Sequence, residues 1–129
     1  MVKKRRDVEE TATLGEPMVV EETSLAKGMR ANLEEIKTYD GIIGYILRNS
    51  ASAAIDLKDP AKIIDYAILS SSSLDAGKQL AEAFDLGEAD SIIVEGKDAK
   101  MLSLTIGGNK ISVFMEKETD CERILRKLR

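Results

Sequence analysis

The chain contains no histidine and only one cysteine among its 129 residues. Without histidine, the most common general base and the usual nitrogen ligand of metals are both missing. One cysteine cannot form a disulfide within the chain, nor supply the thiolates of a structural zinc site. We therefore expect no catalytic residue, no metal site and no cofactor, and we interpret the chain as a non-enzyme.

Long apolar runs and an excess of positive charge are also missing. The apolar runs are far shorter than the roughly 20 residues of a membrane-spanning helix. The net charge is −4, which argues against a nucleic-acid partner because phosphate binding depends on clustered cations. Acidic residues follow the basic cluster Lys3–Arg6 where a signal peptide would need an apolar stretch. We expect a cytoplasmic protein without a membrane span, in which this cluster is a solvated tail or makes a weak contact with anionic lipid or nucleic acid.

The composition is that of one globular domain, with 43% hydrophobic and 33% charged residues. Residues 1–22 are polar and are interrupted by Gly15-Glu16-Pro17. This segment is predicted to be a disordered or extended tail, and residues 23–129 are predicted to form the domain.

The first predicted elements are a helix and two strands. Leu25, Met29, Leu33 and Ile36 recur at helical spacing from about Ser24 onward. Glycine weakens a helix interior, so Gly28 within it suggests close packing. A nearly continuous apolar run at 42–47 indicates a strand covered on both faces. After a turn at 48–50, residues 52–57 are predicted to form a second strand.

A long helix is predicted from Asp59-Pro60 to Leu86, with Gly87 as its C-terminal cap. One face carries a stripe of mostly small residues, flanked by Ile64 and Ile68. Small residues allow a helix to approach another element closely, and we interpret the serines at 70–73 in this way. The alternative for these serines is a contact with a partner or a modification. The stripe comprises Ile63, Ala67, Ser70, Leu74, Gly77, Ala81 and Phe84.

Three strands and a helix are predicted to follow, at 91–95, 100–106, 111–115 and from 119 onward. Gly107-Gly108-Asn109 predicts a hairpin turn, and it lacks the spacing of a phosphate-binding loop. Thr119 and Glu122 form a capping box. Cys121 falls on the apolar face of the last helix and is predicted to be a small core residue.

The order is helix, two strands, long helix, three strands, helix. Strands joined by hairpins form an antiparallel sheet, so we expect an α+β fold with five strands in the order α-β-β-α-β-β-β-α. The apolar first strand requires helices on both faces of this sheet.

This order, together with particular residues, resembles the Roadblock family of dynein light chains and regulators of small GTPases. The segments that carry the resemblance are Gly41–Leu47, Phe84–Gly87, Ser91–Gly96 and Gly107–Asn109. The resemblance implies that the two terminal helices lie on one face of the sheet and the long helix on the other. It also implies a homodimer without a catalytic site, in which the strand after the long helix pairs with its copy and the long helices pack together.

The candidate interaction residues follow from this resemblance. An apolar edge strand invites pairing with another strand, and a closed two-fold interface satisfies its free backbone groups. The alternatives are that the strand is an ordinary internal one, and that both apolar faces of the long helix, the stripe and the face with Ile64 and Ile68, contact only their own sheet. The expected function is docking and regulation of a Ras-like small GTPase, and the alternative is a structural adaptor in a larger complex. The predicted dimer interface comprises Ser91, Ile92, Ile93, Val94, Glu95, Ala67, Ser70, Leu74, Gly77 and Ala81.

Overall fold

The computed structural model describes residues 24–129, so the predicted N-terminal tail lies outside the described residues. The order of elements is the one expected from the sequence. In chain order they are α1 (Ser24–Ile36), β1 (Ile42–Arg48), β2 (Ala53–Leu57), a 3₁₀ turn η1 (Pro60–Lys62), α2 (Ile63–Ala83), β3 (Ser91–Glu95), β4 (Ala99–Ile106), β5 (Asn109–Glu116) and α3 (Cys121–Leu128).

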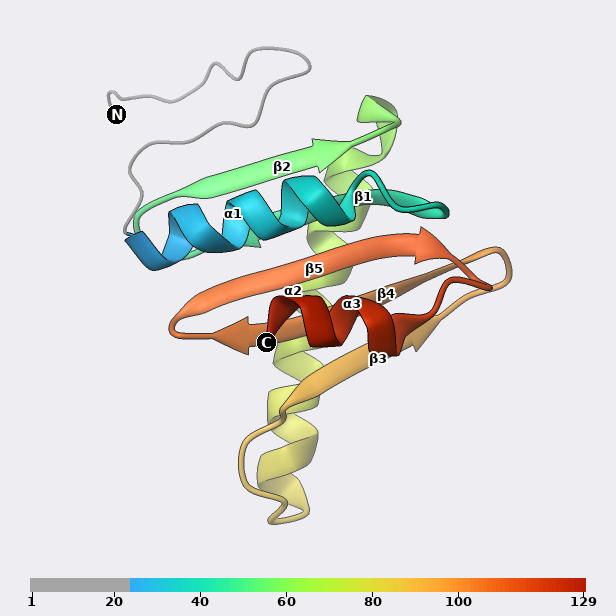
Figure 1. Cartoon of the computed structure of the whole chain (residues 1–129). Coiled ribbons are helices and arrows are strands. Elements are labelled where there is room, and N and C mark those ends of the chain that lie inside the picture. The colour runs from blue at the N-terminus through green and yellow to red at the C-terminus, as the bar shows by residue number, and fades with distance from the viewer. Residues whose placement is uncertain (1–23) are drawn as a thin grey trace.

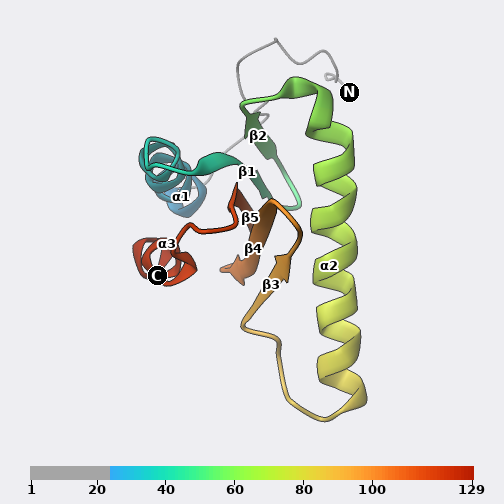
Figure 2. The ribbon, with the colours of Figure 1, turned by 90° about the vertical axis from the view of Figure 1, so that its right-hand side faces the viewer.

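The five strands form one antiparallel sheet in the order β2-β1-β5-β4-β3. Helices α1 and α3 lie on one face of this sheet, and α2 crosses the other face (Figures 1 and 2). This arrangement confirms the predicted α+β fold and the predicted distribution of the helices. Strand β3 is at one edge of the sheet, which is where the resemblance placed it.

The face covered by α1 and α3 holds the main apolar core. Met29, Leu33 and Ile36 of α1 are buried as their spacing predicts, while the side chain of Leu25 lies outside the described part. A hydrogen bond also links α1 to β1: the Tyr45 hydroxyl donates to the Glu34 carboxylate. The buried members of this cluster are Met29, Leu33, Ile36, Ile42, Tyr45, Leu47, Ala54, Leu102, Leu104, Ile111, Val113, Met115, Ile124 and Leu128.

Strand β1 is covered on both faces, as its continuous apolar run predicts. Tyr45 and Leu47 belong to the core under α1 and α3, whereas Ile46 between them belongs to the cluster under α2. The strand register shifts near Gly44, where a Cβ atom would lie 2.3 Å from the carbonyl oxygen of Asp56. Glycine is required there because a side chain would collide with the backbone of β2.

The long helix begins as predicted but ends earlier. The Asp59 carboxylate accepts the Ala61 N–H at 3.1 Å, and Pro60 follows it at the first helical position. At the other end, Asp85 adopts a left-handed φ of 55° and the Leu86 N–H donates to the Ala81 carbonyl at 2.8 Å. The residue in the left-handed cap is therefore Asp85, so the predicted cap at Gly87 is wrong.

Three further local predictions are corrected by the structure. Gly28 is exposed and a Cβ atom there would meet nothing within 4 Å, so the inferred close packing is wrong. Asp120, not Thr119, caps α3 by accepting the Glu122 N–H at 3.0 Å. Asn109 belongs to β5 and not to the turn, because Gly107 and Gly108 alone supply the two positive φ angles of the hairpin.

Candidate interaction surface

Strand β3 is the first part of the candidate surface. It pairs only with β4, so its outer edge has no strand partner among residues 24–129. Ile93 is 53% exposed, while Ile92 and Val94 are half-buried. Side chains alternate along a strand. Ile92 and Val94 therefore point toward α2, and Ile93 points to the other face.

The small-residue stripe of α2 lies against the sheet of its own chain. Ser70 is 2% exposed, and its hydroxyl is 2.5 Å from that of Ser112, which in turn is 2.6 Å from that of Ser103. These three hydroxyls satisfy one another between the helix and the sheet. The predicted role of the stripe in close packing is thus confirmed for Ser70, but its partner there is β5 of the same chain.

Other members of the stripe behave in the same way. Ala81 is 5% exposed, and Ala67 packs with the apolar cluster under α2. A Cβ atom at Gly77 would lie 2.2 Å from Cδ1 of Ile92, so the helix crosses β3 at this glycine. Leu74 is half-buried. The exposed large apolar side chains of α2 are therefore mostly not members of the stripe.

The available side chains lie on the two flanks of α2. Leu69, Leu80 and Phe84 recur at i, i+11 and i+15, close to whole helical turns, and are 36%, 58% and 69% exposed. Ile64 and Ile68 are exposed on the opposite flank, which excludes the alternative that they contact the sheet. Phe84 was expected within the stripe, but it emerges because the end of α2 projects beyond β3 (Figures 1 and 2).

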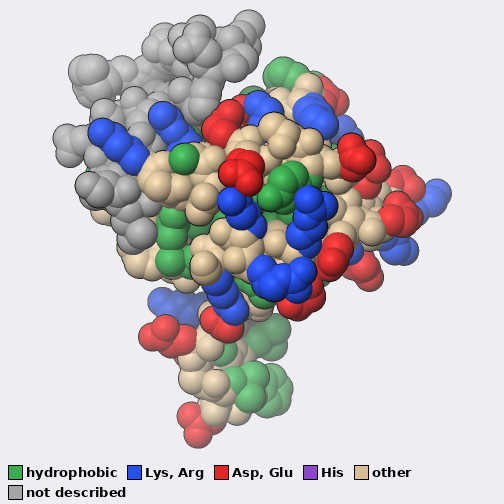
Figure 3. All heavy atoms as spheres, in the orientation of Figure 1, with side chains coloured by type: hydrophobic (Ala, Val, Ile, Leu, Met, Phe, Trp, Pro, Cys, Tyr) green, Lys and Arg blue, Asp and Glu red, His purple; other side chains and the backbone are tan. Residues whose placement is uncertain are grey.

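The projecting end of α2 carries exposed apolar side chains. Figure 3 shows hydrophobic side chains gathered on it at the bottom of the molecule, whereas charged side chains of both signs cover much of the face that carries α1 and α3. Leu86 follows the helix and is 72% exposed. Clustered apolar exposure of this kind marks an interaction surface in soluble proteins.

An apolar cavity of about 110 Å³ lies beside the first half of α2 and the end of β3. The Tyr66 ring forms one wall and stacks on Phe114, with 4.4 Å between the ring centroids. Leu69 of α2 and Val94 of β3 also line the cavity. Its lining comprises Tyr66, Leu69, Val94, Gly96, Ala99, Lys100, Met101 and Phe114.

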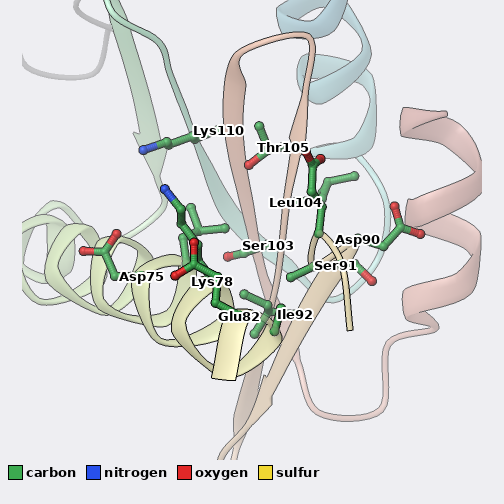
Figure 4. Close-up of a pocket in the computed structure, with 15 residues that line it drawn as sticks. Asp75, Lys78, Glu82, Asp90, Ser91, Ile92, Ser103, Leu104, Thr105 and Lys110 are labelled. Atoms are coloured by element: carbon green, nitrogen blue, oxygen red, sulfur yellow. The ribbon is translucent and has the colours of Figure 1, made fainter. Parts of the chain in front are cut away.

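A larger cavity of about 410 Å³ lies on the other flank of α2, toward the start of β3. Figure 4 shows Lys78 of α2 and Lys110 of β5 above it, with Asp75 and Glu82 on the same helix. The lining carries charges of both signs. This mixture favours neither an anion nor a cation as a ligand.

Burial raises the pKa of two side chains in the described part, Tyr45 and Cys121. Burial, followed by the contact with Glu34, raises the pKa of the Tyr45 phenol well above its usual value. Burial also raises the pKa of the Cys121 thiol, whose Sγ lies 3.7 Å from Met115 Sδ. Cys121 packs against the main core, as predicted. A raised pKa lowers its thiolate fraction and therefore its reactivity at neutral pH.

Neither metal ligands nor a membrane helix can be recognised in the described residues. Within residues 24–129, no group of three or more histidine, cysteine, aspartate or glutamate side chains could hold a metal ion. No helix in this part of the chain is long and apolar enough to cross a membrane.

Sequence reasoning missed Leu69 and Leu80 as surface residues. Their spacing of 11 residues, three helical turns, was a usable signal. This spacing was not recognised as a surface signal because the small-residue stripe on the same helix was interpreted as its interaction face. Only the position of the sheet distinguishes the face that is covered from the flanks that are not.

Comparison with known proteins places the fold. No protein-family model matches the sequence, and no curated protein matches it. Among solved structures, a Roadblock/LC7 domain from Streptomyces avermitilis is 17% identical with a TM-score of 0.63, covering 84% of this chain and 89% of that one. The gliding protein MglB from Thermus thermophilus is 14% identical with a TM-score of 0.65, covering 84% and 86% of the two chains. MglB from Myxococcus xanthus is 14% identical with a TM-score of 0.63, covering 84% and 85%.

Proposed function

We propose that this chain, which has the Roadblock fold, is a homodimeric interaction module that docks and regulates a Ras-like small GTPase. The observation that carries the proposal is the outer edge of β3, which has no strand partner among residues 24–129, beside the exposed apolar side chains at the projecting end of α2. Both features lie on one side of the molecule (Figure 1). A single chain leaves them exposed to water, whereas a second copy covers them.

The edge strand supports the homodimer directly. A free edge offers N–H and C=O groups to any strand that can pair with it. Two-fold pairing of β3 with its copy closes this edge and brings the exposed Ile93 of each copy together. Light scattering coupled to size-exclusion chromatography at micromolar concentration should give twice the mass of one chain.

A variant tests the location of that contact. Ile93→Glu places two carboxylates next to each other on the two-fold axis, and like charges directly opposite each other destabilise strand pairs. We expect this variant to be monomeric and folded, because Ile93 is 53% exposed in the single chain. A wild-type protein that is monomeric at every concentration would contradict the homodimer.

The proposal of a GTPase partner is supported by the Roadblock resemblance and by the absence of histidine, the most common general base. With no histidine in the sequence, the chain is proposed to act on a partner's chemistry and not to perform its own. Regulation would then arise by stabilising one arrangement of the GTPase switch loops. The flank with Ile64 and Ile68 points away from the proposed dimer contact and is the candidate docking site.

The test is a pull-down with Ras-like GTPases from the same genome, each loaded with GDP or a non-hydrolysable GTP analogue. We expect stronger binding in one nucleotide state, and loss of that binding in Ile68→Asp. Ile93→Glu separates docking from dimerisation, because it leaves the Ile64 and Ile68 flank unchanged. Equally weak binding in both nucleotide states would count against regulation.

A structural adaptor is the second candidate function. The same apolar flank could hold a helix of a larger complex without regard to nucleotide. Binding of a partner peptide to the wild type but not to Ile68→Asp, with no nucleotide dependence, would favour the adaptor.

A further inference from the structure

The end of α2 reaches past the sheet by a defined amount. The helix crosses β3 at Gly77, where Ile92 occupies the space of a Cβ atom, and it ends at Ala83. The six steps from residue 77 to residue 83 advance about 9 Å along the helix axis. Neighbouring strands are about 4.8 Å apart. The end of α2 therefore covers a region in which about two further strands would lie.

Two-fold symmetry determines which part of a second copy lies under that end. Antiparallel pairing of β3 with its copy about the middle residue, Ile93, places Ile92 of one chain opposite Val94 of the other. Since α2 crosses its own strand at Ile92, the α2 helix of the second copy must cross near Val94. The two helices then run antiparallel, side by side, on the same face of the joined sheets.

The structure has a cavity at that position. Val94 lines the apolar cavity of about 110 Å³, together with Tyr66 and Leu69. On α2, Leu69 is on the same flank as Leu80 and Phe84. Leu69 and Val94 line the same cavity, so the flank of α2 that faces the incoming helix is the one with Leu69, Leu80 and Phe84.

We propose that Phe84 of one copy fills the apolar cavity beside Leu69 and Val94 of the second copy, and that this contact anchors the dimer. Two-fold symmetry repeats the contact, so each dimer contains it twice. Phe84 is 69% exposed in the single chain, so its burial is driven by the removal of apolar surface from water. The inference rests on the proposed homodimer but adds the residues that hold it.

Sedimentation equilibrium of the purified full chain tests the anchor. Phe84→Ala should raise the dimer dissociation constant about tenfold or more, because buried aromatic anchors dominate interfaces. Ile68→Ala is the matched control, since Ile68 is similarly exposed but lies on the other flank. We expect that control to change the constant by about twofold or less, which is typical of a residue outside the interface.

A double-mutant cycle then tests the partner of Phe84. If Phe84 contacts Leu69 of the second copy, the double variant Phe84→Ala, Leu69→Ala should lose less affinity than the product of the two single losses. For the pair Phe84→Ala and Ile68→Ala, the change in the dissociation constant of the double variant should equal the product of the two single changes. Leu69, Phe84 and Ile68 are all exposed in the single chain, so these variants should fold.

The possible results separate this inference from the function on which it rests. A wild-type dimer that Phe84→Ala leaves unchanged overturns the anchor and keeps the homodimer. A dimer weakened by Phe84→Ala without coupling to Leu69 overturns the proposed cavity contact. A wild-type protein that is monomeric throughout overturns both.

Discussion

Against one face of the sheet lie α1 and α3, and against the other lies α2 alone. Among the residues that the structure describes, the cluster on the first face has fourteen buried apolar residues, whereas the cluster under α2 has four. The middle of the second face is occupied by the hydroxyls of Ser70, Ser103 and Ser112. The large exposed apolar side chains of the described residues lie on α2, just after it at Phe84 and Leu86, and on β3. The difference indicates that the first face provides the stability of the chain, and that the second is available for association.

The largest expected effect comes from the same substitution on the two faces. Leu33→Ala removes a side chain with no exposure and should lower the free energy of unfolding by about 2–5 kcal/mol. Leu80→Ala removes one that is 58% exposed and should change it by about 0.5 kcal/mol or less in the monomeric chain. Urea unfolding at low protein concentration measures both. Equal losses would refute the contrast between the faces.

The serine cluster provides the next test. Ser112→Ala leaves the Ser70 and Ser103 hydroxyls without their shared partner, and an unsatisfied buried polar group costs about 1–3 kcal/mol. Ser72→Ala on the exposed part of α2 is the control and should be nearly neutral. A stable Ser112→Ala variant would mean that apolar contacts alone hold α2 to the sheet.

The loss of stability at high pH should come from Tyr45, which is buried in the core under α1 and α3. The folded state raises the pKa of Tyr45 above the value of about 10 in the unfolded chain, so above that pH the folded state binds more protons. Stability is therefore fully present below pH 10 and falls as the pH rises further, by up to about 1.4 kcal/mol per pH unit. Urea unfolding from pH 8 to 11 measures this slope. Tyr45→Phe should reduce the slope of the unfolding free energy against pH. An unchanged slope would mean that other groups cause it.

The smallest expected effects come from two glycines in helices. Gly28→Ala should stabilise the chain by about 0.5–1 kcal/mol, because a Cβ atom there meets nothing and alanine favours a helix. Gly77→Ala has the same helix preference but forces Ile92 to move, so it should gain less or destabilise. Thermal unfolding compares the two. A larger gain in stability from Gly77→Ala than from Gly28→Ala would contradict the close approach of α2 to β3 at Gly77.

Most of the fold was predictable because the apolar periodicity and the turn residues indicate the same positions for the helices and strands. The apolar spacing of Met29, Leu33 and Ile36 predicted both α1 and the face that it buries, and Asp59-Pro60 predicted the start of the long helix. Element ends were less predictable, since several residues in one loop can cap a helix. Asp85 and Asp120 took the caps expected at Gly87 and Thr119.

The candidate surface was predictable only in part. The apolar run of β3 and its place at the edge were anticipated through the Roadblock resemblance. The helix side chains were not, because a stripe of small residues is compatible with packing against either a sheet or a second helix. The buried hydroxyl of Ser70 shows that here the stripe meets its own sheet.

The sequence by itself determined which segments are helices and strands, and that no histidine is present for catalysis. These properties depend on local periodicity and on composition. The tertiary structure alone decided which side of α2 is covered and how far its end projects beyond β3, because both depend on where the helix crosses a sheet built from strands distant in sequence. That crossing leaves Leu69, Leu80 and Phe84 exposed together on one flank.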